Sequence, residues 1–118
     1  MQEIMEMAER LGQALARTDE YQALKRAIDA SGDDRELAEL QTEIQKLEQE
    51  MQGQLQQGQE PTKEQGEEYE SHFTRLQSNP SYQRLVAAQT NFDKVVGRVN
   101  ETIHKGIQKG AESRIILS

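Results

Sequence analysis

The chain has 118 residues, enough for one domain with a single core, yet only 34% of them are hydrophobic and 4% are aromatic. It has a net charge of -7 and no cysteine, which excludes disulfides, thiol nucleophiles and cysteine-ligated clusters and favours a reducing compartment, the cytoplasm. No stretch approaches the roughly 20 apolar residues of a membrane span, and the start lacks the pattern of a secretion signal, so we expect a protein that is neither exported nor membrane-bound.

The first two predicted helices lie within the first 30 residues. Apolar residues three and four positions apart predict a helix over about residues 2–16, with Ile4, Met7, Ala8, Leu11, Ala14 and Leu15 on one face. Thr18 can cap a second helix, and the acidic residues that follow it suit the positive end of the helix dipole. In this second helix Tyr21, Leu24 and Ile28 are expected to point inward.

The third predicted helix follows the breaker "ASGDD" at residues 30–34, which also offers new capping residues. Its apolar positions repeat at spacings of three and four, which indicates an amphipathic, coiled-coil-like helix: Leu37, Leu40, Ile44, Leu47 and Met51. The Gln-rich stretch 52–63 contains two glycines and a proline, and it predicts a frayed helix end followed by a connector.

Two further helices are predicted after the connector. Thr62 and Gln65 resemble a capping box that opens the fourth helix, in which Tyr69, Phe73 and Leu76 are expected to point inward. Asn79 can cap the fifth helix, with Pro80 at its first position. An apolar stripe then predicts a helix of about 29 residues, or roughly 43 Å, that ends in a left-handed turn at Gly110. The stripe comprises Tyr82, Leu85, Gln89, Phe92, Val96, Val99, Ile103 and Ile107.

One phrase occurs at two of these helix starts, as "TDEYQALKRA" from Thr18 and as "NPSYQRLVAA" from Asn79. In both, a capping residue precedes Tyr-Gln-x-Leu by three positions. We interpret each copy as a tight corner between two helices, with the tyrosine ring packed over the preceding helix. An internal duplication and a common helix-start sequence are both open explanations.

These elements predict an all-α fold, an antiparallel helical bundle of about five helices with a long C-terminal helix. Residues 1–110 are expected to form one domain and residues 111–118 a tail, whose apolar run "IIL" is either disordered or a docking segment. Short helices cannot cover so long an apolar stripe, so we expect a homo-oligomer, a dimer or higher, joined through coiled-coil-like helices. The expected interface residues are Leu40, Leu47, Phe92 and Val99.

A family resemblance rests on "LGQALARTDEYQALKRA", "DDRELAELQTEIQKLEQEMQ", "GQEPTKEQ" and "LQSNPSYQRLVAAQTNFDKVVGRVNETI". Over about residues 5–107 the chain resembles the YlbF/YmcA family of small helical bacterial regulatory proteins, and it is especially similar to the YheA branch. The resemblance implies a cytoplasmic, self-associating protein that acts through protein contacts. Some relatives hold iron–sulfur clusters through cysteines, and this cysteine-free chain lacks the ligands for that cofactor.

Residues that could carry enzyme chemistry are few. Glu101 and His104 have the Glu-x-x-His spacing of a di-iron half-site, and Glu68 with His72 could assist, but a di-iron bundle needs two such motifs. Neither Glu101 nor His104 lies on the apolar stripe, where a buried site would be. We therefore expect no enzyme, no metal and no cofactor, and the di-iron protein is a distant alternative.

The fifth predicted helix also carries a basic ridge, a set of five residues within an arc of about 80° opposite the apolar stripe: Arg84, Lys94, Arg98, Lys105 and Lys109. Residues 1–70 hold 7 basic and 18 acidic residues, a charge of −11, whereas residues 71–118 hold 7 and 3, a charge of +4. A solvated face and a docking surface both fit this ridge. Acidic composition and the absence of interleaved aromatic residues favour an acidic protein partner over nucleic acid.

We expect a regulatory adaptor, with a chaperone-like helical binding protein as the alternative.

Overall fold

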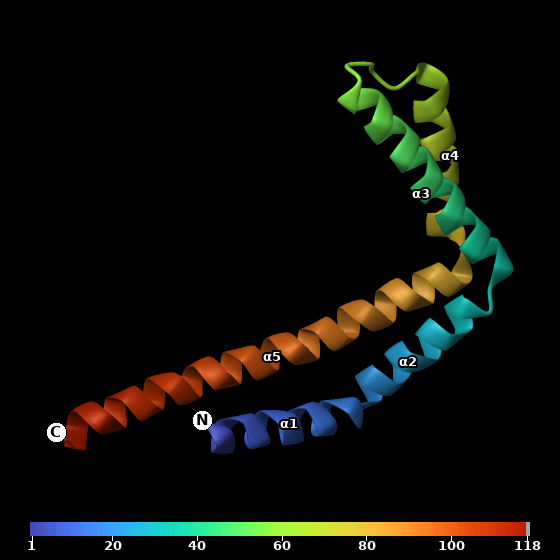
Figure 1. Ribbon diagram of the computed structural model, residues 1–118. Helices are drawn as coiled ribbons and strands as arrows, with labels where there is room; N and C mark the ends of the chain where they lie inside the picture. Colours follow the sequence, from blue (N-terminus) through green and yellow to red (C-terminus); the bar gives the residue numbers. More distant parts are fainter. Residues whose placement is uncertain (118) are drawn as a thin grey trace. The chain divides into compact units, whose positions relative to one another are not determined.

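The computed structural model describes the backbone of residues 1–117 and the side chains of residues 1–112. It contains five α-helices and, in this described part, no β-strand (Figure 1). The helices are α1 (Gln2–Ala16), α2 (Asp19–Gly32), α3 (Arg35–Gln56), α4 (Lys63–Ser78) and α5 (Pro80–Leu117). The predicted all-α class, the five helices and the long last helix are confirmed.

The chain divides into two compact units. The helical-hairpin unit is Lys25–Ala87, and the terminal unit joins Met1–Leu24 to the chain from Ala88 onward. Helices α2 and α5 each contribute to both units.

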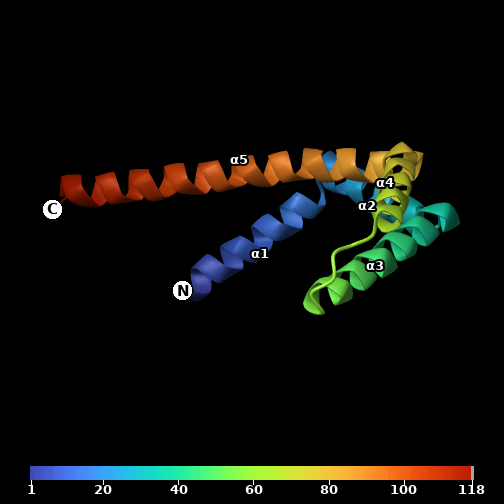
Figure 2. The same ribbon diagram turned by 90° about the horizontal axis from the view of Figure 1, so that it is seen from above.

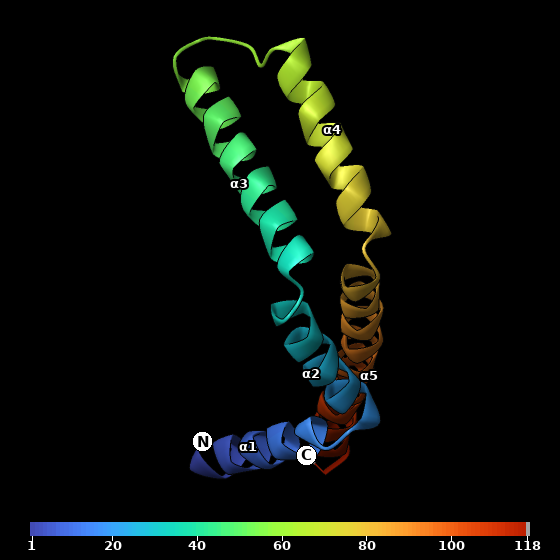
Figure 3. The ribbon, with the colours of Figure 1, turned by 90° about the vertical axis from the view of Figure 1, so that its right-hand side faces the viewer.

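Helices α3 and α4 lie side by side as an antiparallel hairpin, joined at one end by the connector (Figure 3). Each begins at a side-chain cap: the Asp34 carboxylate accepts the amide of Leu37 at 3.0 Å, and Thr62 forms the predicted capping box with Gln65. Helix α3 ends at Gln56, and the chain then turns at Gly58, whose φ of 78° lies in the left-handed region that favours glycine; the amide of Gln59 donates to the carbonyl of Gln54 at 2.8 Å. The helix end predicted to be frayed is thus a closed turn.

Apolar residues of α3 and α4 form the core of the hairpin. Leu37, Ile44 and Leu76 are buried together, and Tyr69 and Tyr82 pack against them. Leu40 and Leu47 of α3 are buried as well. The three-four spacing of α3 therefore identified its buried face correctly.

A polar network links the first turns of α3 and α5 within the same unit. Asn79 is 5% exposed; its Nδ2 donates to Asp34 Oδ2 at 3.3 Å and its Oδ1 accepts the amide of Tyr82 at 3.0 Å. The pKa of Asp34 is lowered, first by the amide of Leu37 and then by side-chain hydrogen bonds from Ser81 and Asn79. Since the folded state favours the carboxylate, this contribution to stability is present near neutral pH and is lost as the pH falls through the lowered pKa.

The repeated sequence phrase forms the same corner twice. At the first corner, Thr18 Oγ1 accepts the amide of Tyr21 at 3.1 Å, and Gln22 Nε2 reaches back to donate to the carbonyl of Ala16 at 2.8 Å. The ring of Tyr21 meets Phe92 edge-on, with the ring centroids 5.3 Å apart.

The second corner has matching bonds. Asn79 Oδ1 caps the amide of Tyr82 at 3.0 Å, and Gln83 Nε2 donates to the carbonyl of Gln77 at 2.8 Å. Both glutamines reach six residues back to the end of the preceding helix. The phrase therefore specifies a helix corner. Tyr82 packs, as predicted, against a cluster that includes Leu76 of the preceding helix, whereas the ring of Tyr21 packs on Phe92 of α5.

Three further details differ from the sequence prediction. Helix α5 has 38 residues and continues through Gly110 (Figure 2), because an interior glycine weakens a helix by only about 1 kcal/mol and its neighbours favour helix. The predicted helix end at Gly110 is therefore wrong, while the division into a domain and a tail at 110 stays a prediction. Ile28 and Phe73, expected to point inward, are 51% and 39% exposed. Phe73 stacks on Tyr69, with the ring centroids 6.1 Å apart.

Candidate interaction surfaces

The terminal unit exposes apolar side chains along two helices. No residue of α1 is buried, although the helix is strongly amphipathic, and Ile4, Met5 and Met7 are each more than half exposed. On α5, Ile103 and Ile107 are 47% and 62% exposed. We call these five residues, together with Leu11, the apolar surface of the terminal unit. Exposed apolar residues that follow a helical stripe mark a contact surface more often than a random scatter does.

A shallow groove of about 390 Å³ lies beside this apolar surface. Its apolar lining comes mainly from α5, and one acidic and one basic side chain also line it. The lining residues are Leu11, Glu20, Val95, Arg98, Val99, Thr102 and Ile103. Helix α1 supplies Leu11, and the first turn of α2 supplies Glu20. A groove of this composition can accept aliphatic side chains from another helix.

The four predicted interface residues fall into two groups. Leu40 and Leu47 are 2% and 5% exposed and lie in the hairpin, so a single chain already buries most of their surface. Phe92 and Val99 are half-buried in α5, and Val99 lines the groove. The structure thus does not bring the four residues onto one exposed patch, and their shared role in an interface stays a prediction.

All five basic-ridge residues, Arg84, Lys94, Arg98, Lys105 and Lys109, are exposed on α5. Among the side chains that the structure describes, none of the five forms an ion pair with an acidic residue. Their positive charge is therefore not neutralised within the described part of the chain.

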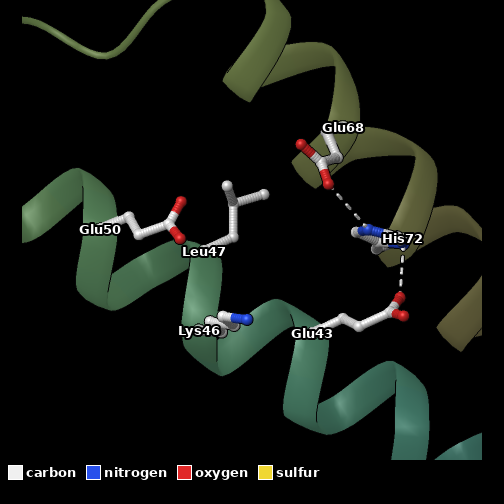
Figure 4. Close-up of a pocket in the computed structure, with 6 residues that line it drawn as sticks. All are labelled: Glu43, Lys46, Leu47, Glu50, Glu68 and His72. Atoms are coloured by element: carbon white, nitrogen blue, oxygen red, sulfur yellow. Dashed lines mark ion pairs between the residues drawn. The ribbon is translucent and has the colours of Figure 1, made fainter.

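A third feature, which was not predicted from the sequence, is a cluster of polar side chains between α3 and α4 (Figure 4). His72 Nδ1 lies 3.4 Å from Glu43 Oε2, and His72 Nε2 lies 3.6 Å from Glu68 Oε1. The side chain of His72 is only 16% exposed, whereas Glu43 and Glu68 are 54% and 61% exposed. The Glu68–His72 spacing was visible in the sequence, but the approach of Glu43 depends on the register of the hairpin.

Further contacts tie α3 to α4 on either side of this cluster. The Tyr69 hydroxyl donates to Glu48 Oε1 at 3.1 Å. This hydrogen bond is the largest cause of the raised pKa of Tyr69, and desolvation of the hydroxyl is the next largest. Arg75 and Glu36 form an ion pair at 3.7 Å in which both side chains are more than half exposed. Such an exposed pair adds little to stability because solvent screens it.

The residues considered for metal chemistry do not form a site. Glu101 and His104 are both exposed on α5. Across the described residues, no three His, Cys, Asp or Glu side chains are grouped in a way that could hold a metal ion. The two carboxylates beside His72 face opposite nitrogens of its ring, so they do not converge on one point.

These observations define a small all-helical protein whose accessible features are an apolar surface, a shallow groove and a basic ridge. A family model described as control of competence regulator ComK, YlbF/YmcA, matches residues 4–108, nearly the whole chain. The chain belongs to this family, which is a regulatory one. The narrower resemblance to the YheA branch stays a prediction.

Individual relatives align over almost their entire length. A UPF0342 protein of Streptococcus mutans is 29% identical over 105 residues, which cover 89% of this chain and 93% of the relative. A UPF0342 protein of Bacillus thuringiensis is 26% identical over 106 residues, covering 90% of each chain. A UPF0342 protein of Bacillus anthracis matches to the same extent. No described helix is both long and apolar enough to cross a membrane.

Proposed function

We propose that this protein is a non-enzymatic cytoplasmic regulator, an adaptor that acts through contacts with other proteins. The observation that carries this proposal is the apolar surface of the terminal unit, where an amphipathic helix has no buried residue. Regulatory adaptors need accessible surfaces of this kind, and membership of a regulatory family agrees with such a role.

Self-association is the first contact that we propose, and it places the homo-oligomer interface at the apolar surface of the terminal unit. Ile4, Met7 and Leu11 of α1 and Ile107 of α5 leave apolar area in water that a second copy could cover. Covering apolar surface is favourable by about 25 cal/mol per Å². The half-buried Phe92 and Val99 lie in the same unit and could extend such an interface.

The basic ridge is the second proposed contact, and its partner would be an acidic protein. The ridge side chains are exposed, and basic side chains that no acidic group neutralises attract a negatively charged surface and speed its encounter. Four of the five ridge residues lie in the terminal unit: Lys94, Arg98, Lys105 and Lys109.

Reversing the charge of three of these four residues should therefore remove partner binding. In a variant with Lys94→Glu, Arg98→Glu and Lys105→Glu, we expect unchanged helicity, since all three side chains are exposed, and a fall in captured partner of about tenfold or more. Affinity capture from the native cell, with partners quantified by mass spectrometry, measures this effect.

The matched control is Lys25→Glu, Arg26→Glu and Lys63→Glu, which changes net charge equally at exposed positions off the ridge. This control should capture partners as the unmodified protein does. An adaptor should return a few defined partners, whereas a chaperone-like protein would return a heterogeneous set. Equal capture by the two triple variants would refute the ridge as the binding surface.

A further inference from the structure

Helix α1 leaves most of its apolar face uncovered by its own chain. Leu11 lines the groove beside α5, but Ile4 and Met7 are more than half exposed, and α1 diverges from α5 toward its first residue (Figure 2). The facing part of α5 is open as well, since Ile103 and Ile107 are exposed. Each of these two helices therefore keeps an apolar stripe that the other does not cover.

The two open stripes match in length. The apolar face of α1 runs from Ile4 to Leu15, about 17 Å along the helix at 1.5 Å per residue. On α5, the groove and the exposed apolar residues extend from Val95 to Ile107, about 18 Å. A second helix with the dimensions of α1 therefore fits along this part of α5.

Charge distinguishes between the ways in which two copies could cover these stripes. Helix α1 contains three glutamates and one arginine, a charge of −2, whereas residues 94–109 of α5 contain four basic residues and one acidic residue, a charge of +3. Two α1 helices side by side would repel each other, and so would two copies of this part of α5. Helix α1 of one copy and α5 of another would attract each other.

The charged side chains stand beside the apolar stripes. Glu3 and Glu6 lie on the same side of the apolar face of α1, since successive residues are 100° apart. On α5, Arg98 belongs to the basic ridge and also lines the groove, and Lys105 follows it two turns later on the same side. All four side chains are exposed, and none forms an ion pair with another residue that the structure describes.

We infer that two copies of this chain associate reciprocally, with α1 of each copy lying along α5 of the other. This arrangement rests on the self-association proposed above and specifies which helices meet. It covers both open apolar stripes and places the acidic side of α1 beside the basic ridge of the other copy. Because each copy gives one α1 and receives one, the contacts close into a two-fold symmetric dimer.

Charge exchange tests this arrangement in purified protein, where no other acidic partner is present. A variant of α1 with Glu3→Lys and Glu6→Lys places like charges at both contacts, and so does a variant of α5 with Arg98→Glu and Lys105→Glu. At low ionic strength, each should raise the dissociation constant of the dimer by about tenfold or more in sedimentation, with unchanged helicity. A chain that carries all four substitutions should dimerise as the unmodified protein does.

Mixing the α1 variant with the α5 variant separates a contact between chains from one within a chain. In the mixed dimer both contacts again join opposite charges, so it should form more tightly than either variant does alone. A contact within one chain would give no rescue on mixing. The matched control for the α1 variant is Glu39→Lys with Glu67→Lys, which makes the same change of charge at exposed positions of the hairpin unit and should leave the dimer intact.

The outcomes distinguish this inference from the proposed self-association. A dimer that neither charge variant weakens, or weakened variants that mixing does not rescue, would overturn the reciprocal arrangement alone. A monomeric unmodified protein would overturn both.

Cross-linking decides if a charge variant loses helicity. The chain has no cysteine of its own, so a chain with Glu6→Cys mixed with a chain with Arg98→Cys should be joined by a bifunctional thiol reagent. Equal cross-linking of chains that carry Glu6→Cys alone would show α1 against α1 and contradict the inference.

Discussion

Replacing Leu37 with alanine should lower the free energy of unfolding by about 2–5 kcal/mol. Leu37 is 1% exposed and is buried together with Ile44 and Leu76, so the substitution removes buried apolar contacts and leaves a cavity between α3 and α4. Because domains of this size are stable by only about 5–15 kcal/mol, the change should be visible as a large shift of the urea midpoint.

Leu55→Ala is the matched control, since it is the same substitution in the same helix at a side chain that is 59% exposed. It should change the free energy of unfolding by less than about 0.5 kcal/mol. Both variants are compared at one protein concentration, because self-association would add to apparent stability. Similar losses in the two variants would mean that the hairpin core is not where the structure places it.

Replacing Asn79 with alanine should cost about 1–3 kcal/mol, more than an ordinary cap substitution. Asn79 is buried and serves two helices: it caps α5 through the amide of Tyr82, and it donates to Asp34, the cap of α3. Alanine removes both bonds and leaves the Asp34 carboxylate without one of its donors.

Two further variants separate these roles. Asn79→Ser keeps a capping hydroxyl but removes the donor to Asp34, so its loss should be intermediate. Thr18→Ala removes the equivalent cap at the first corner, where α2 rather than α5 begins, and should cost only about 1 kcal/mol. If Asn79→Ala and Thr18→Ala lowered the free energy of unfolding equally in urea, the hydrogen bond between Asn79 and Asp34 would contribute nothing to stability beyond the cap.

The helix starts and the buried face of α3 could be predicted because their signals are local. Thr18, Thr62 and Asn79 each precede an exposed helix amide that their side chains can reach, and the spacing of Leu37 and Leu40 fixes which face is apolar. The repeated phrase predicted the two helix corners for the same reason, because the hydrogen bonds that form each corner join residues at most six positions apart.

Contacts between distant residues could not be predicted in this way. Asp34 and Asn79 are 45 positions apart, and Glu43 meets His72 only because α3 and α4 pack in one particular register. The predicted end of α5 at Gly110 was wrong because glycine occurs both inside helices and at their ends. The two cases differ in backbone conformation, which the sequence does not show. The exposure of Ile28 depends on what the rest of its unit leaves uncovered, which periodicity cannot show.

Sedimentation velocity at micromolar concentration tests most directly the proposal that the apolar surface of the terminal unit is a contact surface. We expect a species of at least twice the 13.5 kDa chain mass. Because their side chains are exposed within one chain, Met7→Glu with Ile107→Glu should yield a monomer of unchanged helicity. Leu55→Glu, an equally exposed apolar position on α3, should leave the oligomer intact. A cooperatively folded 13.5 kDa monomer of the unmodified protein would contradict the proposal.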